Sequence, residues 1–149
     1  MPPLKMGLLW TLDGIKELLK AASRTTTNGG TTALEDVRQL GPIVYVLDSA
    51  KASAGTDPTL TPTLVHADAS NGTPVDLGVT WYNEAGEAVT EITDAADPGA
   101  LYAYVDPRET DGFVGFVGTI GGTNSPAFTY SLVRLAMPLG PVPTSADPA

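Results

Sequence analysis

The sequence contains no cysteine among its 149 residues. That absence excludes a disulfide framework, catalysis by a thiolate and zinc sites built on cysteine. Histidine is nearly absent as well, because His66 is the only one. A lone histidine lacks the second and third ligands that a metal site needs. We therefore interpret His66 as an ordinary residue at the end of a strand.

Charged side chains are also scarce, at 17% of the chain, and the basic ones are the fewest. Eight Lys and Arg face 17 Asp and Glu, which gives a net charge of −9. Nucleic-acid-binding proteins present a basic surface, so no contact with DNA or RNA is expected. Low charge is typical of a strand-and-turn protein, and equally of a surface covered by neighbouring copies. The acidity is interpreted as a solubility feature, with complementarity to a basic surface as the alternative.

Long hydrophobic runs are missing from the start of the chain. The first ten residues carry only the short apolar run LLW at positions 8–10. This run is too short for a signal peptide or a membrane span. We expect a soluble protein, made in a reducing cytoplasm and without a membrane partner.

Catalytic and cofactor motifs are lacking too. There is no Gly-x-Ser-x-Gly elbow, and the Gly pairs at 29–30 and 121–122 precede no Lys-Ser or Lys-Thr as a phosphate loop would. The acidic stretch around Asp94, Asp97 and Asp106 does not match an EF-hand loop, and calcium bound there is the lesser alternative. A pair of glycosidase carboxylates is not excluded by spacing in the sequence. The prediction is a protein that is not an enzyme and has no cofactor or metal.

The chain divides into three zones, of which residues 1–41 form an N-terminal arm. Apolar residues from Leu12 to Ala22 recur at helical spacing after Asp13, which predicts a short amphipathic helix over 13–22. So short a helix is marginal alone and needs another surface. We therefore predict inter-subunit packing by Leu8, Leu9, Trp10, Leu12, Ile15, Leu18 and Leu19. Residues 32–35 (TALE) are either one capped helical turn or plain loop.

Residues 42–136 form the second zone and read as a β domain. Alternating and β-branched segments predict strands at 43–47, 60–66, 79–83, 88–92, 101–105, 113–120 and 128–136. Residues 84–87 form the turn of a hairpin, and Pro62 indicates an edge strand or a bulge. The predicted fold is mainly β, an antiparallel β-sandwich of jelly-roll or immunoglobulin-like type. The third zone, 137–149, holds four prolines and is predicted to run extended.

Trp81 and Tyr82 are adjacent aromatic residues in one predicted strand. Successive side chains of a strand point to opposite faces. The favoured interpretation is therefore one core aromatic and one surface aromatic. The alternative is that one of them belongs to a sugar-binding platform.

One phrase occurs twice in the chain. Residues 55–65 (GTDPTLTPTLV) return, with one insertion, as residues 122–133 (GTNSPAFTYSLV). Each copy is a turn rich in Gly and Pro that leads into a strand alternating Thr or Ser with larger residues. The repeat predicts two similar turn–strand units within one sandwich.

This phrase, with residues 46–60 and 105–133 around it, resembles small virion proteins of tailed bacteriophages. The similarity covers residues 43–135 and is to head decoration (cement) proteins and related head or tail accessory proteins. It implies a β-sandwich on the capsid exterior, often a trimer at a three-fold axis, that binds the major capsid protein and bridges capsomers. A tail or head–tail connector component is the alternative within virions. A carbohydrate-binding module that uses Trp81 or Tyr82 is the alternative of another class.

Overall fold

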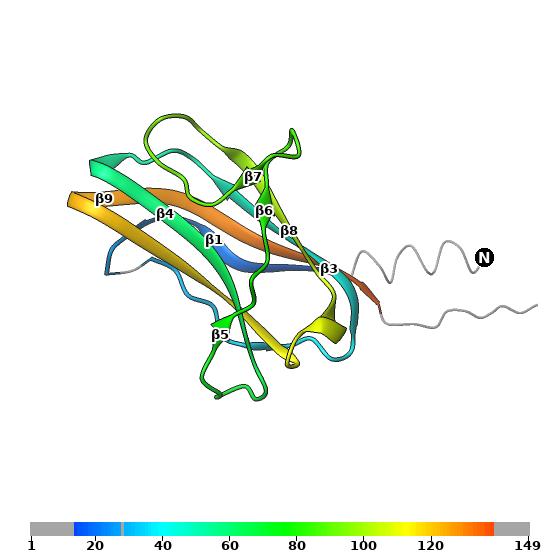
Figure 1. Cartoon of the computed structure of the whole chain (residues 1–149). Helices are drawn as coiled ribbons and strands as arrows, with labels where there is room; N and C mark the ends of the chain where they lie inside the picture. Colours follow the sequence, from blue (N-terminus) through cyan, green and yellow to red (C-terminus); the bar gives the residue numbers. More distant parts are fainter. Residues whose placement is uncertain (1–13, 28, 139–149) are drawn as a thin grey trace, which may run out of the picture.

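The protein forms a curled antiparallel sheet, seen here in a computed structural model that describes residues 14–27 and 29–138 (Figure 1). The strand order is β5-β4-β9-β3-β8-β6-β7, and β1 and β2 both pair with β9. The elements are β1 (Ile15–Thr25), β2 (Glu35–Asp36), β3 (Leu40–Ser49), β4 (Ala54–Ala67), β5 (Val75–Asp76), β6 (Trp81–Tyr82), β7 (Ala88–Val89), β8 (Gly99–Val105), the 3-10 turn η1 (Pro107–Glu109) and β9 (Phe113–Pro138).

Strand β9 curls the sheet into two layers. Its first half pairs with β4 and, on the other side, with β2, whereas its second half pairs with β3 and β1. Between the halves, Gly122, Asn124 and Ser125 have positive φ angles, a backbone geometry that turns the strand back on itself. Figure 1 shows the two halves running in opposite directions from this corner. The predicted mainly β, sandwich-like architecture is confirmed.

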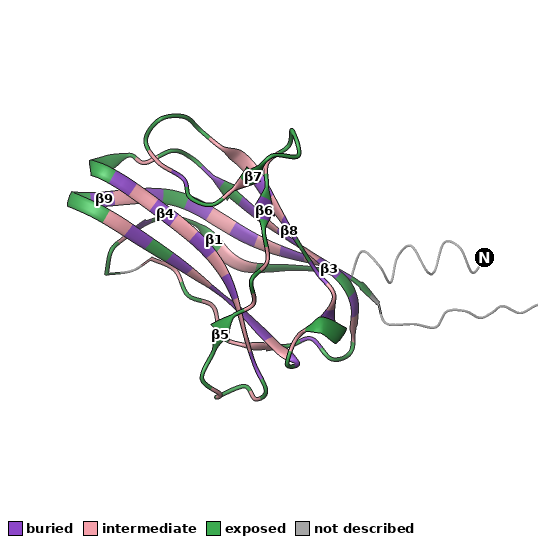
Figure 2. Cartoon of the chain, viewed as in Figure 1, coloured by how far each residue is buried: buried purple, intermediate pink, exposed green. Residues whose placement is uncertain are grey.

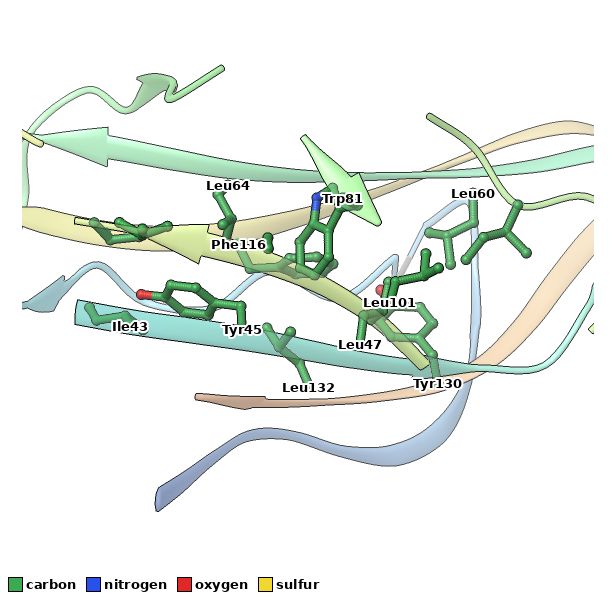
Figure 3. Packing of buried hydrophobic residues seen from close by; sticks show 14 of the residues in the cluster. Ile43, Tyr45, Leu47, Leu60, Leu64, Trp81, Leu101, Phe116, Tyr130 and Leu132 are labelled. Atoms are coloured by element: carbon green, nitrogen blue, oxygen red, sulfur yellow. The ribbon is translucent and has the colours of Figure 1, made fainter. Parts of the chain in front are cut away.

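The core lies between the two layers (Figure 3). Along β3, Tyr45 and Leu47 are buried while Val44 and Val46 are half-buried on the opposite face, as the period of a strand requires. Figure 2 shows this alternation along β3, β4 and β9. Phe116 of β9 packs edge-to-face against Trp81, with ring centroids 6.1 Å apart. Each such large apolar side chain contributes roughly 1.5–3 kcal/mol when it is buried.

The predicted helix over residues 13–22 is wrong, because residues 15–25 form strand β1. This strand pairs antiparallel with the second half of β9, from Ile15 opposite Leu135 to Thr25 opposite Ala127. A short helix gains little by itself, whereas the exposed edge of β9 offers a full row of backbone partners. Register shifts between Glu17 and Ala22 interrupt the alternation of β1. Such bulges produce apolar spacing that mimics a helix.

Arg24 fixes the bulged end of β1. Its guanidinium donates to the carbonyls of Lys20, Ala22 and Tyr130. It also lies over the Tyr130 ring, 4.5 Å from the ring centroid. The side chain is only 7% exposed, so these acceptors replace the water that the cation loses.

The strands predicted for the second zone are all present, although those around 79–83 and 88–92 shorten to β6 and β7, and 113–120 and 128–136 are one continuous strand. Of the two alternatives for Pro62, an edge strand or a bulge, the edge is found: the outer side of β4 is only partly paired, by Ile92 at Leu60 and by β5 at Val65 and His66. The β6–β7 hairpin also forms. Of the two alternatives for residues 32–35, the helical turn is absent: the segment is loop leading into β2.

The two copies of the repeated phrase lie side by side at the corner of the sandwich. Thr56 pairs with Thr123, and the Asn124 side-chain amide donates to the Thr56 hydroxyl at 2.7 Å. A Cβ atom on Gly122 would lie 2.8 Å from the Asp57 carbonyl oxygen, and one on Gly55 would lie 2.6 Å from Pro126 Cα. The repeat is therefore a pair of turn units whose glycines let the two backbones approach closely.

Candidate functional site

The face of the sheet that points away from the core presents an unusual set of side chains. Residues in register on neighbouring antiparallel strands point to the same side. Across β1, β9, β3, β8 and β6 the pairings therefore align two rows on this side, which we call the outer face: Ile15, Leu135, Val44 and Tyr104 in one row, and Val133, Val46, Tyr102 and Tyr82 in the other.

The two rows are apolar over β9 and β3 and at Ile15 of β1, while Glu17 of β1 stands opposite Val133 in the second row. We call the apolar part the apolar patch; it consists of Ile15, Val44, Val46, Val133 and Leu135. Ile15 is 51% exposed, and the other four side chains are half-buried. Contiguous apolar surface of this kind is typical of interaction sites.

The seven residues predicted to pack between subunits fall into three groups. Ile15 belongs to the apolar patch. Leu18 and Leu19 are half-buried against the chain's own core. Leu8, Leu9, Trp10 and Leu12 lie outside the described residues. The inter-subunit role of the set stays a prediction.

The part of the outer face over β8 and β6 is aromatic. Tyr82 stands directly opposite Tyr102, and Tyr104 lies two residues further along the same side of β8. Tyr82 is 38% exposed and Tyr104 is 62% exposed. We call Tyr82, Tyr102 and Tyr104 the tyrosine cluster. It lines a hollow of about 300 Å³ together with Asn83, Glu84 and Gly86.

The predicted division between Trp81 and Tyr82 is confirmed. Trp81 is 3% exposed and packs in the core, while Tyr82 lies on the surface. Tyr102 and Tyr104 were not predicted as surface residues. The signal was present, since both alternate with Leu101, Ala103 and Val105, which are buried.

The hairpin beside the tyrosine cluster is held rigidly by Asn83. Its side-chain carbonyl accepts from the backbone N–H groups of Ala85 at 3.0 Å and Glu87 at 2.9 Å. Its amide nitrogen donates to the Glu87 carboxylate at 3.0 Å. Such local bonds replace backbone pairing in a tight turn. The wall of the hollow is therefore preformed.

A charged cluster joins β1, β2 and β9. Glu35 of β2 accepts from Arg134 Nη2 at 2.7 Å and Nε at 3.0 Å, and from Lys16 Nζ at 2.9 Å. Burial raises the pKa of the Glu35 carboxyl, but the bonds from Arg134 and Lys16 outweigh it, so the pKa lies below its usual value. Both cations of the cluster are thus paired with Glu35, which links the three strands.

The hollow beside η1 carries two arginines, Arg38 and Arg108. Each is paired with the aspartate two residues before it, Asp36 at 2.7 Å and Asp106 at 2.8 Å. Hydrogen bonds from Arg38 lower the pKa of Asp36 to about 2. The charges of each pair cancel, so the hollow is not an anion site.

Three other residues that were considered as metal or catalytic candidates, His66, Asp97 and Asp106, make hydrogen bonds within the fold. His66 is the second-to-last residue of β4, and its Nδ1 accepts from the backbone N–H of Asp111 at 3.0 Å. Asp97 accepts from the backbone N–H of Lys51, and Asp106 caps η1. Within residues 14–27 and 29–138, no three His, Cys, Asp or Glu side chains gather as a metal site. The same residues include no helix with the length and apolarity for crossing a bilayer.

Comparison with known proteins yields distant structural similarity. The CBM22-1 xylan-binding domain from Paenibacillus barcinonensis Xyn10C matches with a TM-score of 0.51 and 17% identity, over 85% of this chain and 84% of that domain. The SPBc2 prophage-derived protein YomS has a TM-score of 0.43 and 11% identity, over 80% and 90% of the two chains. A protein of the disulfide-linked pili of Bacillus endospore appendages has a TM-score of 0.36 and 13% identity, over 83% and 89%.

No protein-family model and no curated protein matches the sequence. At these identities, the similarity to solved structures concerns the β-sandwich fold alone.

Proposed function

We propose that this protein is a structural protein of a tailed-phage virion, a head decoration protein that packs against other subunits and stabilises the shell. The observation that carries the proposal is the apolar patch on the outer face of the sheet. Stable interfaces have an apolar centre that is depleted of charge. The resemblance of residues 43–135 to decoration proteins supports the same class of function.

The occupant that we assign to the apolar patch is the N-terminal segment of a second copy of this chain. Residues 1–13 lead directly to Ile15, at the β1 edge of the patch, and carry Leu8, Leu9, Trp10 and Leu12. Fully extended, 13 residues span up to ~45 Å. The three strands that carry the apolar patch are together only ~10 Å wide. The segment is thus long enough to cross the apolar patch of a neighbouring copy.

Exchange of such segments around a three-fold axis gives a closed trimer, in which each copy contributes and receives one segment. A stable contact buries on the order of 1,000 Å² or more. Repetition of the trimer over a shell then adds many modest contacts to the capsid through multivalency.

The first test is the oligomeric state of the full-length protein, measured by sedimentation velocity. We expect a trimer for the native sequence. Ile15→Asp places a charge in the patch and deletion of residues 2–12 removes the occupant, so both variants are expected to be monomers. Val75→Asp is the matched control, because Val75 is 53% exposed on β5 and lies off the outer face. A native protein that stays monomeric, or a loss of trimer in Val75→Asp as complete as in Ile15→Asp, contradicts the assembly.

The second test is the position of the protein in particles of the phage that encodes it, determined by electron cryomicroscopy. A decoration protein is expected on the outer surface of the shell, at three-fold or quasi-three-fold positions. Density in a ring at the portal vertex or along the tail would favour a connector or tail component instead. Particles that lack the protein would overturn the proposed function.

A further inference from the structure

We infer that the tyrosine cluster, together with the rim of the β6–β7 hairpin, is a binding site for a neutral oligosaccharide. This site goes beyond the proposed structural role and does not depend on it. The apolar patch occupies β1, β9 and β3, whereas the tyrosine cluster lies on β8 and β6. In the strand order, β6 and β7 are separated from β1 by β9, β3 and β8. A subunit packed on the patch can therefore leave the cluster open.

Three tyrosines at neighbouring positions of β6 and β8 line the same hollow. Tyr82 and Tyr102 are a directly opposed cross-strand pair, and such pairs have Cβ atoms about 4.5–5.5 Å apart. Tyr104 extends the cluster along β8 and is the most exposed of the three, at 62%. An exposed tyrosine combines an apolar ring face with a hydroxyl that exchanges hydrogen bonds. A pyranose ring has the matching construction, with apolar C–H faces and hydroxyls around its edge.

The hollow beside the rings supplies polar groups at its rim. Glu84 lines it next to Tyr82, and its carboxylate can accept hydrogen bonds from sugar hydroxyls. The hairpin that carries Glu84 is fixed by the three side-chain bonds of Asn83. A preformed site loses little conformational entropy on binding, which favours a small ligand with few contacts. This rigid, concave wall suits an oligosaccharide better than a flat protein surface.

Charge restricts the class of sugar. None of the described residues that line the hollow is basic, while Glu84 is acidic and the whole chain carries a net charge of −9. A sulfated or uronic-acid glycan would meet repulsion with no compensating cation. The site therefore fits neutral glycans.

The experiment is isothermal titration of the full-length protein with cellohexaose, mannohexaose and fully N-acetylated chitohexaose, and with a heparin hexasaccharide as the anionic probe. We expect saturable binding of at least one neutral hexasaccharide and none of heparin. Tyr104→Ala removes the most exposed ring and should weaken binding by at least about tenfold, because it deletes a buried apolar contact. Tyr104→Phe keeps the ring and should stay within about threefold of the native affinity. Glu84→Gln should weaken binding less than Tyr104→Ala.

Sedimentation velocity on the same variants separates this site from the assembly. Tyr104→Ala is expected to leave the oligomeric state unchanged, whereas Ile15→Asp is expected to leave sugar affinity unchanged. The inference is overturned if no neutral hexasaccharide binds at millimolar concentration, if Tyr104→Ala binds as well as the native protein, or if heparin binds more tightly. Loss of the oligomer in Tyr104→Ala without any sugar binding would make the tyrosine cluster a subunit contact instead.

Discussion

Glu35 illustrates how a single side chain can hold distant strands together. It lies on β2, one of the shortest strands, and accepts hydrogen bonds from Arg134 of β9 and Lys16 of β1. Arg134 is only 6% exposed, so the Glu35 carboxylate, and not water, stabilises its positive charge. Leaving a buried cation unpaired is costly, because the protein interior does not replace the water that the cation lost. The cluster secures the edge at which β1 joins the sheet.

Replacement of Glu35 by Gln is expected to lower the free energy of unfolding by about 2 kcal/mol at pH 7, since hydrogen bonds to charged groups contribute roughly that much. The Glu35 pKa is lower in the folded protein than its ordinary value of 4.5. The stabilisation is therefore fully present above pH 4.5 and is lost as the pH falls through the folded-state pKa.

Urea denaturation of both proteins between pH 3 and pH 8 measures this difference. The gap between native protein and Glu35→Gln should be constant above pH 6 and should narrow below pH 4.5. Glu91→Gln, at an exposed position, is the control and should match the native protein at neutral pH. A gap that does not change with pH would mean that Glu35 acts through packing and not through its charge.

At the scale of elements, the repeated phrase makes the corner of the sandwich. Each copy begins with a glycine at positive φ, Gly55 and Gly122, and each continues through a second positive-φ residue, Asp57 and Asn124. The two turns pack on one another where β4 meets the bend of β9. The two similar sequences therefore form the two sides of one contact, at the corner of the sandwich.

Replacement of Gly122 by Ala should destabilise the protein by about 3 kcal/mol, because it combines an unfavourable φ of +111° with a Cβ that would lie 2.8 Å from the Asp57 carbonyl oxygen. Gly86→Ala is the matched control. Gly86 also has a positive φ, of +82°, but no atom lies within 4 Å of its added Cβ. It should cost about 1 kcal/mol. Equal losses in chemical denaturation would show that the close approach of the two turns contributes nothing.

The elements also show what the sequence could and could not reveal. Strands β3 and β8 alternate regularly, so their buried faces follow directly from their periodicity. Strand β1 is bulged between Glu17 and Ala22, and its apolar spacing therefore imitates a helix. Tyr82 was a surface candidate because it neighbours Trp81. Its grouping with Tyr102 and Tyr104 depends on the pairing of β6 with β8, which no local pattern encodes.

At the scale of the whole molecule, β9 joins the two layers into one unit. Its first half carries Phe116 into the core from the layer of β4, and its second half carries Tyr130 and Leu132 from the layer of β3. Figure 3 shows these side chains facing one another across the core. Each layer buries its apolar inner face only against the other layer, so both layers should form and unfold together.

This sharing of β9 predicts a single cooperative unfolding transition. Trp81 reports on the core between the layers, since it is 3% exposed and contacts Phe116. Replacing Trp10 by Phe leaves Trp81 as the only tryptophan. In this variant, the urea transitions followed by Trp81 fluorescence and by far-ultraviolet circular dichroism should coincide, as two-state unfolding requires. A fluorescence change that precedes the loss of β signal would mean that the layer carrying β6 and β8 opens first. The continuity of β9 would then fail to couple the two halves of the fold.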